Sequence, residues 1–317
     1  MNYLELNNIH FKFKGEGIGF VGLSLQVSSG QVLGILGESG SGKTTLLKLL
    51  GGHLSPDHGQ IWLNYENITN VPPQARPIST VFQDLALFPH LNVFDNVAFG
   101  LKLRKLPKSE IHRQTMQILD LMGLKPFLDK DVNDLSGGQR QRVALSRALA
   151  VSPKVLLLDE PFSSLDFNTR QRVKETIFTI KRNFNITIIL VTHDHNDAIE
   201  LCDKLCVIRE FQLLASGPTN LLLSQPPSAE IVKYFGCYNE VSLNEEVFYC
   251  RYNRVRLHTV YSLPLVPAII ESISNSFNIC YVKCRYGESI LNVIQANDIE
   301  LTPGAQVFVE FLEKIHI

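Results

Sequence analysis

Apolar and polar positions divide the first two thirds of the chain into short hydrophobic runs separated by longer mixed segments. The runs at 31–36, 155–158 and 187–192 are apolar or nearly so, which is typical of strands buried on both faces of a sheet. The segments between them show the spacing of amphipathic helices. Up to about Gly217 the pattern therefore predicts an α/β fold, a largely parallel sheet with helices on both faces.

Two stretches depart from this alternation. Residues 1–30 alternate between apolar and polar positions, which favours antiparallel strands. Residues 84–134 carry no strand signal, and 111–122 has the periodicity of a helix. The sequence thus predicts an antiparallel start and a helical region set into the α/β fold.

From about Val241 the pattern changes to short strands separated by turn formers such as Asn275 and Gly287. The expected strands are 247–251, 268–274, 279–285, 290–295 and 307–312. Such a series is typical of a small all-β barrel, OB-like in type. Pro226-Pro227 and the polar segment 239–246 mark the connection, so we expect one domain at 1–236 and a second at 241–317.

A glycine-rich segment, 37–45, follows the first buried run and precedes a predicted helix. Its glycines let consecutive backbone N–H groups and the positive end of the helix dipole point at an anion. This strand–loop–helix order is the context of a phosphate-binding loop, in which Lys43 reaches the outer phosphates and Thr44 ligates Mg²⁺. The predicted nucleotide-binding residues here are Gly37, Ser39, Gly40, Ser41, Gly42, Lys43, Thr44 and Thr45.

Two carboxylates, Asp159 and Glu160, follow the buried run 155–158. The carboxyl end of a buried strand is where open α/β sheets hold their ligands. Downstream of a phosphate loop, the pair predicts a metal ligand in Asp159 and, in Glu160, the group that polarises an attacking water. An acidic pair that only ends a strand is the alternative interpretation, which the loop upstream disfavours.

A second glycine-rich turn, Leu135-Ser136-Gly137-Gly138-Gln139, precedes a predicted helix at 139–150 and is a second potential anion site. Together with the loop and Asp159-Glu160, it resembles the nucleotide-binding subunits of ATP-binding cassette (ABC) transporters. The resemblance implies a P-loop NTPase cassette that forms a head-to-tail homodimer. ATP would lie between Lys43 of one copy and the turn of the other, at Ser136, Gly137, Gly138 and Gln139.

Other positions match the family pattern one by one. Gln83 matches the glutamine that senses Mg²⁺ and the attacking water, and His193 matches the switch histidine on the γ-phosphate. The segment Ser163-Ser164-Leu165-Asp166 matches the loop that crosses the dimer interface, with Asp166 as its acid. The helical region corresponds to the inserted helical subdomain of these cassettes, at about 84–150.

Phe13 lies where the family stacks an aromatic ring on adenine, a contact that depends on the π face of the base. Because Ile9, Phe11 and Phe13 alternate, Phe13 can also be read as a core aromatic of a strand. The spacing to Gly37 favours the stacking role.

Two further regions resemble the importer group of this family. Segment 81–97 matches the cleft that receives a short helix of the transmembrane subunit, and Leu87, Phe88 and Phe94 suit such a docking surface or the packing of the helical subdomain. The C-terminal barrel resembles the accessory domain, TOBE-like, of importers of sugars, polyamines, ferric iron, sulfate and molybdate. Many relatives have Arg-Pro-Glu early in it, whereas this chain has Arg251-Tyr252-Asn253. We therefore assign it no ligand residues and favour a dimerising or spacing role.

Composition limits the partners. Thirty Lys and Arg against 31 Asp and Glu give a net charge of −1, so no basic field favours nucleic acid. No apolar stretch reaches the roughly 18 residues of a membrane span, and the N-terminus lacks a secretion signal. Six cysteines without C-x-x-C spacing are expected to be free thiols. We expect a peripheral protein at the cytoplasmic face of the inner membrane.

The expected function is the ATP-hydrolysing subunit of an ABC uptake transporter, using ATP and Mg²⁺. Its expected partners are a second copy, integral membrane permease subunits and, indirectly, an external solute-binding protein. General resemblance favours ferric iron or a polyamine as the solute, with sulfate and sugars left open. One alternative is a soluble ABC ATPase of translation or DNA repair, although those usually have two cassettes or a long coiled-coil insertion. Another is a regulatory module whose barrel senses a small anion.

Overall fold

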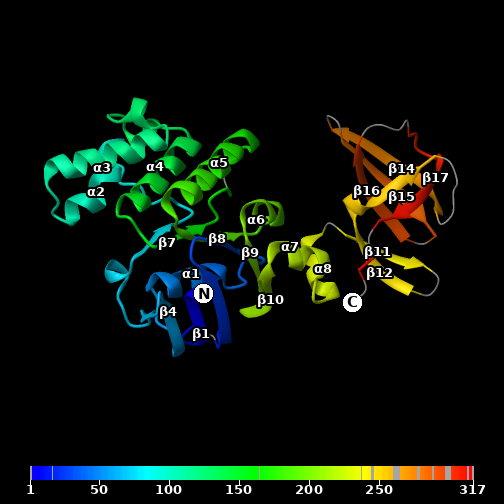
Figure 1. Ribbon diagram of the computed structural model, residues 1–317, viewed down its shortest axis with the longest axis horizontal. Coiled ribbons are helices and arrows are strands. Elements are labelled where there is room, and N and C mark those ends of the chain that lie inside the picture. Colours follow the sequence, from blue (N-terminus) through cyan, green and yellow to red (C-terminus); the bar gives the residue numbers. More distant parts are fainter. Residues whose placement is uncertain are drawn as a thin grey trace. The chain divides into compact units, whose positions relative to one another are not determined.

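The computed structural model describes residues 2–15, 17–163, 165–236, 238–243, 246–259, 265–276, 279–287, 289–296, 301–312 and 314–315. The chain divides into two compact units, 1–219 and 220–317 (Figure 1). This division lies next to the change of composition near Gly217. The sequence predicts a boundary further along, at 236–241, and this boundary stays a prediction. Helices α7 (Thr219–Ser224) and α8 (Ala229–Phe235) lie between the two positions.

The first unit is built on a mixed sheet with the strand order β10-β9-β3-β8-β7-β6. Neighbours from β9 to β6 are parallel, and β10 pairs antiparallel with β9. The strands are β3 (Val32–Leu36), β6 (Ile78–Val81), β7 (Val155–Asp159), β8 (Thr187–Thr192), β9 (Lys204–Arg209) and β10 (Gln212–Pro218). Every residue of β3, β7 and β8 is buried, which confirms the continuously apolar runs as central strands.

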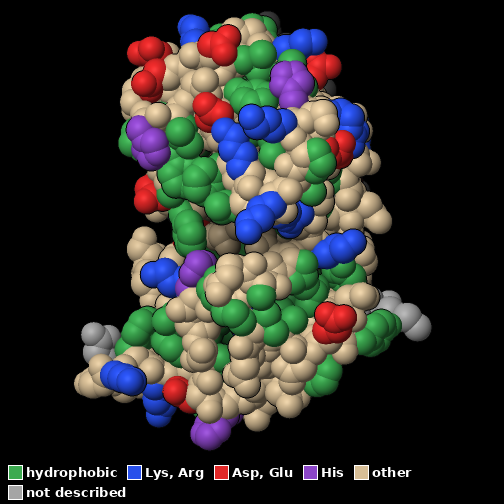
Figure 2. Space-filling model, turned by 90° about the vertical axis from the view of Figure 1, so that its left-hand side faces the viewer, with side chains coloured by type: hydrophobic (Ala, Val, Ile, Leu, Met, Phe, Trp, Pro, Cys, Tyr) green, Lys and Arg blue, Asp and Glu red, His purple; other side chains and the backbone are tan. Residues whose placement is uncertain are grey.

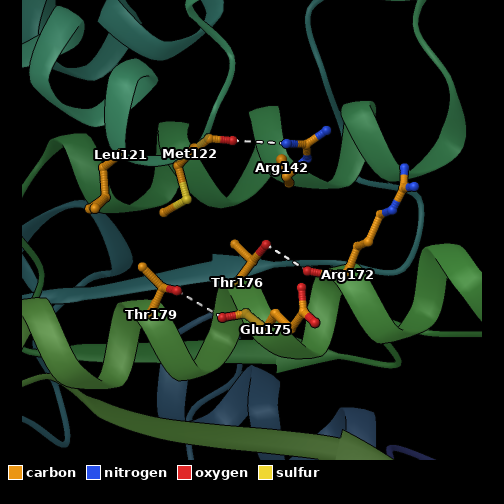
Figure 3. A pocket seen from close by; sticks show the side chains of 7 residues that line it. All are labelled: Leu121, Met122, Arg142, Arg172, Glu175, Thr176 and Thr179. Carbon is orange, nitrogen blue, oxygen red and sulfur yellow. Dashed lines mark hydrogen bonds between the residues drawn. The ribbon is translucent and has the colours of Figure 1, made fainter.

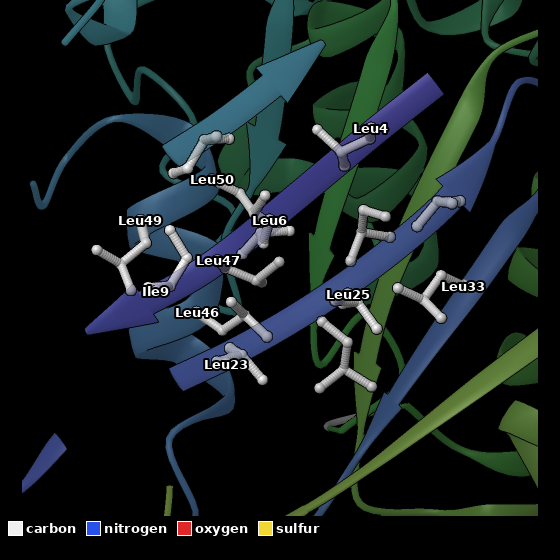
Figure 4. Close-up of a cluster of buried hydrophobic side chains, with 14 of the residues drawn as sticks. Leu4, Leu6, Ile9, Leu23, Leu25, Leu33, Leu46, Leu47, Leu49 and Leu50 are labelled. Atoms are coloured by element: carbon white, nitrogen blue, oxygen red, sulfur yellow. The ribbon is translucent and has the colours of Figure 1, made fainter. Parts of the chain in front are cut away.

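A second, antiparallel sheet with the order β2-β1-β4-β5 includes the N-terminal strands. Its strands are β1 (Asn2–Lys12), β2 (Gly19–Ser28), β4 (His58–Leu63) and β5 (Glu66–Asn67). Apolar side chains of β1 and β2, among them Leu4, Leu6 and Leu25, pack with those of α1 (Lys43–Gly51) and β3 in one buried cluster (Figure 4). This core fixes the start of α1, where the phosphate loop ends.

The helices fall into two groups along the chain. Helices α5 (Phe167–Phe184) and α6 (His195–Leu201) connect strands of the central sheet. Helices α2 (Val93–Leu103), α3 (Lys108–Leu121) and α4 (Gly137–Ala150) form the helical region expected at about 84–150, and pack on one another (Figure 1). Short 3₁₀ turns complete the unit: η1 (Pro73–Ala75), η2 (Lys125–Phe127) and η3 (Val132–Asp134).

After α8 the described part of the second unit consists of β-strands and a short 3₁₀ turn. A hairpin pairs β11 with β12, and a curved sheet has the order β13-β17-β14-β15-β16, a half-barrel consistent with an OB-like domain. The elements are β11 (Tyr238–Leu243), β12 (Glu246–Arg251), η4 (Tyr252–Arg254), β13 (Val255–His258), β14 (Val266–Ser276), β15 (Ile279–Tyr286), β16 (Ser289–Ala296) and β17 (Gln306–Phe311). Its core includes Val241, Phe248 and Val293.

The interpretation of 239–246 as a polar connection was wrong. Its larger part is strand β11, in which Asn239 is 2% exposed. The amide of Asn239 donates to the carbonyl of Asn292 at 2.9 Å and accepts from the backbone N–H of Asn292 at 2.7 Å. A polar side chain here satisfies the edge of β16 in the manner of a neighbouring strand.

Candidate functional site

The predicted catalytic residues follow four strands that are neighbours in the central sheet. Strand β3 leads into the phosphate loop, β8 ends just before His193, β7 ends at Asp159, and β6 ends two residues before Gln83. The order β3-β8-β7-β6 is parallel throughout, so these four carboxyl ends lie along one edge of the sheet. The sheet therefore gathers residues that lie up to 150 positions apart.

Two positions of the phosphate loop require glycine. Gly42 has φ 106°, and a Cβ atom there would lie 2.7 Å from the ring of Phe211. A Cβ atom on Gly37 would lie 2.4 Å from the carbonyl oxygen of Ile208. Ser39 and Gly40 are exposed at the tip of the loop, whereas Ser41 and Thr45 are buried on its inner side.

Lys43 begins α1 and is 7% exposed. Its ammonium donates to the carbonyl oxygens of Gly37 and Glu38, at 2.8 Å each. Burial lowers the pKa of Lys43, and the nearby carboxylates of Glu160 and Asp159 oppose that shift. The lysine is thus fixed inside the loop, with its charge in a poorly solvated setting.

Thr44 and Asp159 approach each other across the same edge. The Thr44 hydroxyl lies 3.4 Å from Oδ1 of Asp159. Asp159 is 5% exposed, and burial raises its pKa, with the charge of Glu160 adding to the effect. Asp159 and Thr44 thus bring a buried carboxylate and a hydroxyl together. These are hard oxygen donors of the type that Mg²⁺ prefers.

Glu160 and His193 form a pair beside Asp159. Glu160 has φ 48°, and its backbone N–H donates to the carbonyl of Val191 on β8 at 3.0 Å. Its carboxylate lies 2.8 Å from Nδ1 of His193, with 15% of the Glu160 side chain and 60% of the His193 side chain exposed. The left-handed backbone thus turns the carboxylate toward the histidine at the solvent edge of the site.

A network of charges between α5 and α6 supports the residues after His193. Arg170 on α5 pairs with Asp194, the N-cap of α6, and with Asp197. Lys174, 4% exposed, pairs with Asp197 at 2.9 Å and also with Glu200. The segment that carries His193 is therefore held to α5 by buried and partly buried ion pairs.

A cavity of about 630 Å³ adjoins these residues. Its lining includes Thr44, Lys48, Phe82, Gln83, Asp84, Ala86, Asp159 and Ser163. The three predicted metal ligands, Thr44, Gln83 and Asp159, thus share one cavity. Arg147, which the sequence analysis did not identify, donates from α4 to backbone carbonyls just after Gln83.

The predicted partner turn is not part of this cavity. Ser136 caps α4: its hydroxyl accepts from the backbone N–H of Gln139 at 3.3 Å, and the Gln139 side chain accepts from the N–H of Ser136 at 2.9 Å. Gly137 and Gly138 continue this helix start beside α5, where a Cβ atom on Gly138 would lie 2.4 Å from Cγ2 of Thr169. Across the described residues, no hydrogen bond joins this turn to the phosphate loop.

Asp166, the acid of the predicted interface loop, caps α5 by accepting from the backbone N–H of Thr169 at 3.0 Å. Hydrogen bonds from Thr169 lower the pKa of Asp166. Ser164 of the same loop lies outside the described residues.

Phe13 is half-buried at the edge of the first core. Its ring makes edge contacts with Phe11 at 5.0 Å and with Phe211 at 6.2 Å, between ring centres. Phe211 adjoins Gly42, and its backbone N–H donates to the carbonyl of Ser41 at 2.9 Å. Phe13 is thus linked to the phosphate loop through Phe211, a residue that the sequence analysis also missed.

The described cysteines are not among the residues that line the cavity at Asp159. They are Cys202, Cys206, Cys250, Cys280 and Cys284, and each of them is buried. Burial raises the pKa of Cys206 and of Cys284 to about 12 each, which disfavours the nucleophilic thiolate form. As for the membrane, the helices in the described ranges include none with the length and apolarity to cross it.

Comparison with known proteins agrees with this geometry. Residues 20–163 match the family model described as ABC transporter. A spermidine/putrescine import ATP-binding protein, PotA, of Mycoplasma capricolum is 39% identical over 76% of this chain and 68% of its own. An Fe(3+) ions import ATP-binding protein, FbpC, of Photobacterium profundum is 39% identical over 85% of this chain and 75% of its own.

A molybdate/tungstate import ATP-binding protein, WtpC, of Thermococcus kodakarensis is 42% identical over 69% of this chain and 66% of its own. The solved structure of CbiO1 from Clostridium perfringens, part of the ABC transporter complex CbiONQ, covers 73% of this chain and 93% of its own, with a TM-score of 0.66 at 29% identity. The chain therefore belongs to the import ATP-binding subunits of ABC transporters, ATPases that energise uptake.

Proposed function

We propose that this chain binds ATP and Mg²⁺ at the carboxyl edge of its central sheet and hydrolyses the nucleotide there. The observation that carries the proposal is the set of four neighbouring strands, β3, β8, β7 and β6, which lead to Lys43, His193, Asp159-Glu160 and Gln83. Loop N–H groups and Lys43 hold the phosphates.

The metal ligands are Thr44, Asp159 and Gln83. The three residues line one cavity. Burial raises the pKa of Asp159, and a bound cation would stabilise the ionised form of this carboxylate. Bound Mg²⁺ offsets negative charge on the phosphates.

Glu160 orients the attacking water and accepts its proton, and His193 contacts the γ-phosphate. The 2.8 Å contact between Glu160 and His193 supports their action as a unit. Lys43 offsets the charge that develops on the transferred phosphoryl group. Phe13, whose ring contacts Phe211 beside the phosphate loop, stacks on adenine.

Two copies of the chain form a head-to-tail dimer that encloses two nucleotides. The support is that the Ser136 turn is a capped helix start of the anion-binding type, which does not line the cavity that holds Asp159 in the same chain. Ser136, Gly137, Gly138 and Gln139 then complete the site of the partner copy, and Asp166 lies at the crossing loop. Each site is incomplete without the second copy.

The partners outside the dimer are integral membrane permease subunits, and the dimer lies peripherally on them at the cytoplasmic face of the inner membrane. Phe88 and Phe94 in the segment after Gln83 are half-buried, and they suit a docking surface for a permease helix. Figure 2 shows the side of the first unit with α2, α3 and β4, where hydrophobic side chains lie between Lys and Arg side chains.

The imported solute is ferric iron or a polyamine, delivered by an external solute-binding protein. Relatives named for spermidine/putrescine and for Fe(3+) ions match this chain at the same identity, 39%. Sequence identity therefore does not distinguish the two solutes. The ligand of the solute-binding protein would identify which one is imported.

The test is purification of the tagged chain from membranes in mild detergent, with assay of ATP hydrolysis by what is recovered. We expect a multi-span permease and an active ATPase, and a co-purified solute-binding protein that binds iron or a polyamine. Recovery of ribosomes or DNA-repair proteins instead, lost steeply with added salt, would favour the alternative of a soluble ABC ATPase.

A further inference from the structure

A second cavity, of about 440 Å³, lies between α4 and α5 beside the end of α3. Arg142 of α4 and Arg172, Glu175 and Thr176 of α5 line it (Figure 3). It shares no described lining residue with the cavity that holds Asp159. A volume of this size lies in the range of small-molecule sites.

Two guanidinium groups approach this cavity from different helices. Arg142 donates to the carbonyl of Met122 at 3.0 Å. Burial lowers the pKa of Arg142, and the positive charge of Arg172 adds to that effect, so the two cations are within electrostatic reach. The guanidinium of Arg172 has neither a hydrogen bond nor an ion pair within the described ranges. An anion between the two groups would relieve their repulsion.

The threonine hydroxyls of the wall supply no donor to a ligand, because each donates its hydrogen elsewhere. The hydroxyls of Thr176 and Thr179 donate to carbonyls of their own helix, at 2.9 Å each. The N–H groups of the two arginines are therefore the charged donors that face the cavity. Glu175, which also lines the cavity, is exposed, and its negative charge would repel a bound anion.

The other end of the cavity is apolar. This end is lined by Leu121, which is 40% exposed, and by Met122. Figure 3 shows both side chains on the opposite side of the view from Arg172. A ligand that fills the cavity therefore has an apolar body as well as a negative group. We propose that this cavity binds a small organic anion, a phosphate monoester or carboxylate, that bridges Arg142 and Arg172 and lays its apolar part on Leu121 and Met122.

Such a ligand would link the two helices whose first turns contact nucleotide. Helix α4 begins at the Ser136 cap and α5 at the Asp166 cap, and the helices are in close contact where Gly138 meets Thr169. The anion would therefore act as an effector that holds the Ser136 turn against α5. This last step rests on the proposed function, whereas the binding itself does not.

The experiment is calorimetric titration of the full-length chain with phenyl phosphate, while saturating ADP and Mg²⁺ occupy the phosphate loop. We expect binding that Arg172→Gln weakens about tenfold, because the substitution removes a charge-assisted hydrogen bond to the ligand. Arg182→Gln, an exposed arginine on the same helix, changes net charge equally and leaves the affinity unchanged. Glu175→Gln tightens binding, and inorganic phosphate binds more weakly than phenyl phosphate.

Equal affinity in the native chain and in Arg172→Gln overturns the site. Weaker binding in Glu175→Gln overturns the assignment of an anion, because it means that the ligand needs a negative partner. Slower amide hydrogen exchange in α4 and α5 with phenyl phosphate supports the bridge. The ADP isotherm is recorded first, so a failure of nucleotide binding is seen separately from a failure of anion binding.

Discussion

Arg147 donates to the carbonyl of Leu85 at 2.8 Å and so joins α4 to the segment that begins with Gln83. The carbonyl of Ala86 accepts from the same guanidinium at 2.6 Å, and the ring centre of Phe88 lies 5.1 Å from it. Leu85 and Ala86 have φ values of 60° and 44°, in a left-handed region that costs residues with side chains about 1–3 kcal/mol each. The arginine therefore stabilises a backbone shape that positions Gln83.

Arg147→Met keeps an apolar stem but removes both donors. We expect ATP hydrolysis by the assembled transporter to fall about tenfold or more, because each lost charged hydrogen bond is worth about 1.5–3 kcal/mol. Nucleotide affinity should stay near that of the native chain, since Lys43 and its loop are unchanged. Steady-state kinetics and nucleotide binding separate the two effects, with Arg113→Met, an exposed residue of α3, as control. A fall in affinity that matches the fall in rate contradicts a role limited to positioning.

Glu160→Gln tests the base. The amide keeps the shape of the side chain but cannot accept the proton of the attacking water, so we expect turnover to fall by at least about a hundredfold. ATP should still bind and hold two copies together, which size-exclusion chromatography with Mg·ATP detects as a dimer. His193→Ala is the comparison, because it removes the partner of Glu160 at 2.8 Å. An undiminished rate in Glu160→Gln would falsify the assignment.

Asp159 gives a prediction on stability and pH. Burial raises its pKa above the ordinary value, so the folded chain holds that proton more tightly than the unfolded chain does. The ionised carboxylate therefore destabilises the fold above the raised pKa, and this destabilisation disappears as the pH falls below the ordinary value. Asp159→Asn should raise the unfolding temperature at neutral pH and lose this advantage near pH ~4, the ordinary pKa of Asp.

Thermal unfolding across this range makes the check, with and without Mg·ATP. The native chain should gain more from Mg·ATP than Asp159→Asn does, because a ligand of the cation is removed. Lower stability of Asp159→Asn at neutral pH contradicts the sign of the pKa shift.

Gly138→Ala tests the contact between α4 and α5. The new Cβ atom would lie 2.4 Å from Cγ2 of Thr169, so the helices have to separate, at a cost of about 1–3 kcal/mol. Thr169→Ser removes that methyl group and keeps the hydroxyl near Asp166. The double variant should therefore recover most of the lost stability in urea denaturation. If Thr169→Ser gives no recovery, the contact is not what requires glycine.

Three of the four strands that carry the site, β3, β7 and β8, were predictable because they are buried on both faces. A central parallel strand has to be apolar at nearly every position, so β3, β7 and β8 were visible as continuous runs. The phosphate loop and Asp159-Glu160 were found from their position after such runs. The sequence also indicated the barrel strands from β14 to β17, although not their partners.

Other features left little trace in the sequence. Strand β13 has only four residues, too few for an alternating pattern to be recognised. Asn239 looks like a loop residue, yet its amide replaces a strand's backbone bonds. The contact of Arg147 with Leu85 spans 62 positions and ends on a backbone carbonyl. Every residue has that group, so no side-chain pattern could reveal it.

The phosphate loop supplies its own partners for Lys43, the carbonyls of Gly37 and Glu38 at 2.8 Å. Under the proposed function, an incoming nucleotide exchanges these two bonds for its own, which lowers the net gain in free energy on binding. The same exchange runs in reverse after hydrolysis, because the loop can take the ammonium back as the product leaves. Because Lys43 has alternative partners within the loop, nucleotide affinity is lower but the product leaves more readily. This suits an ATPase that turns over repeatedly.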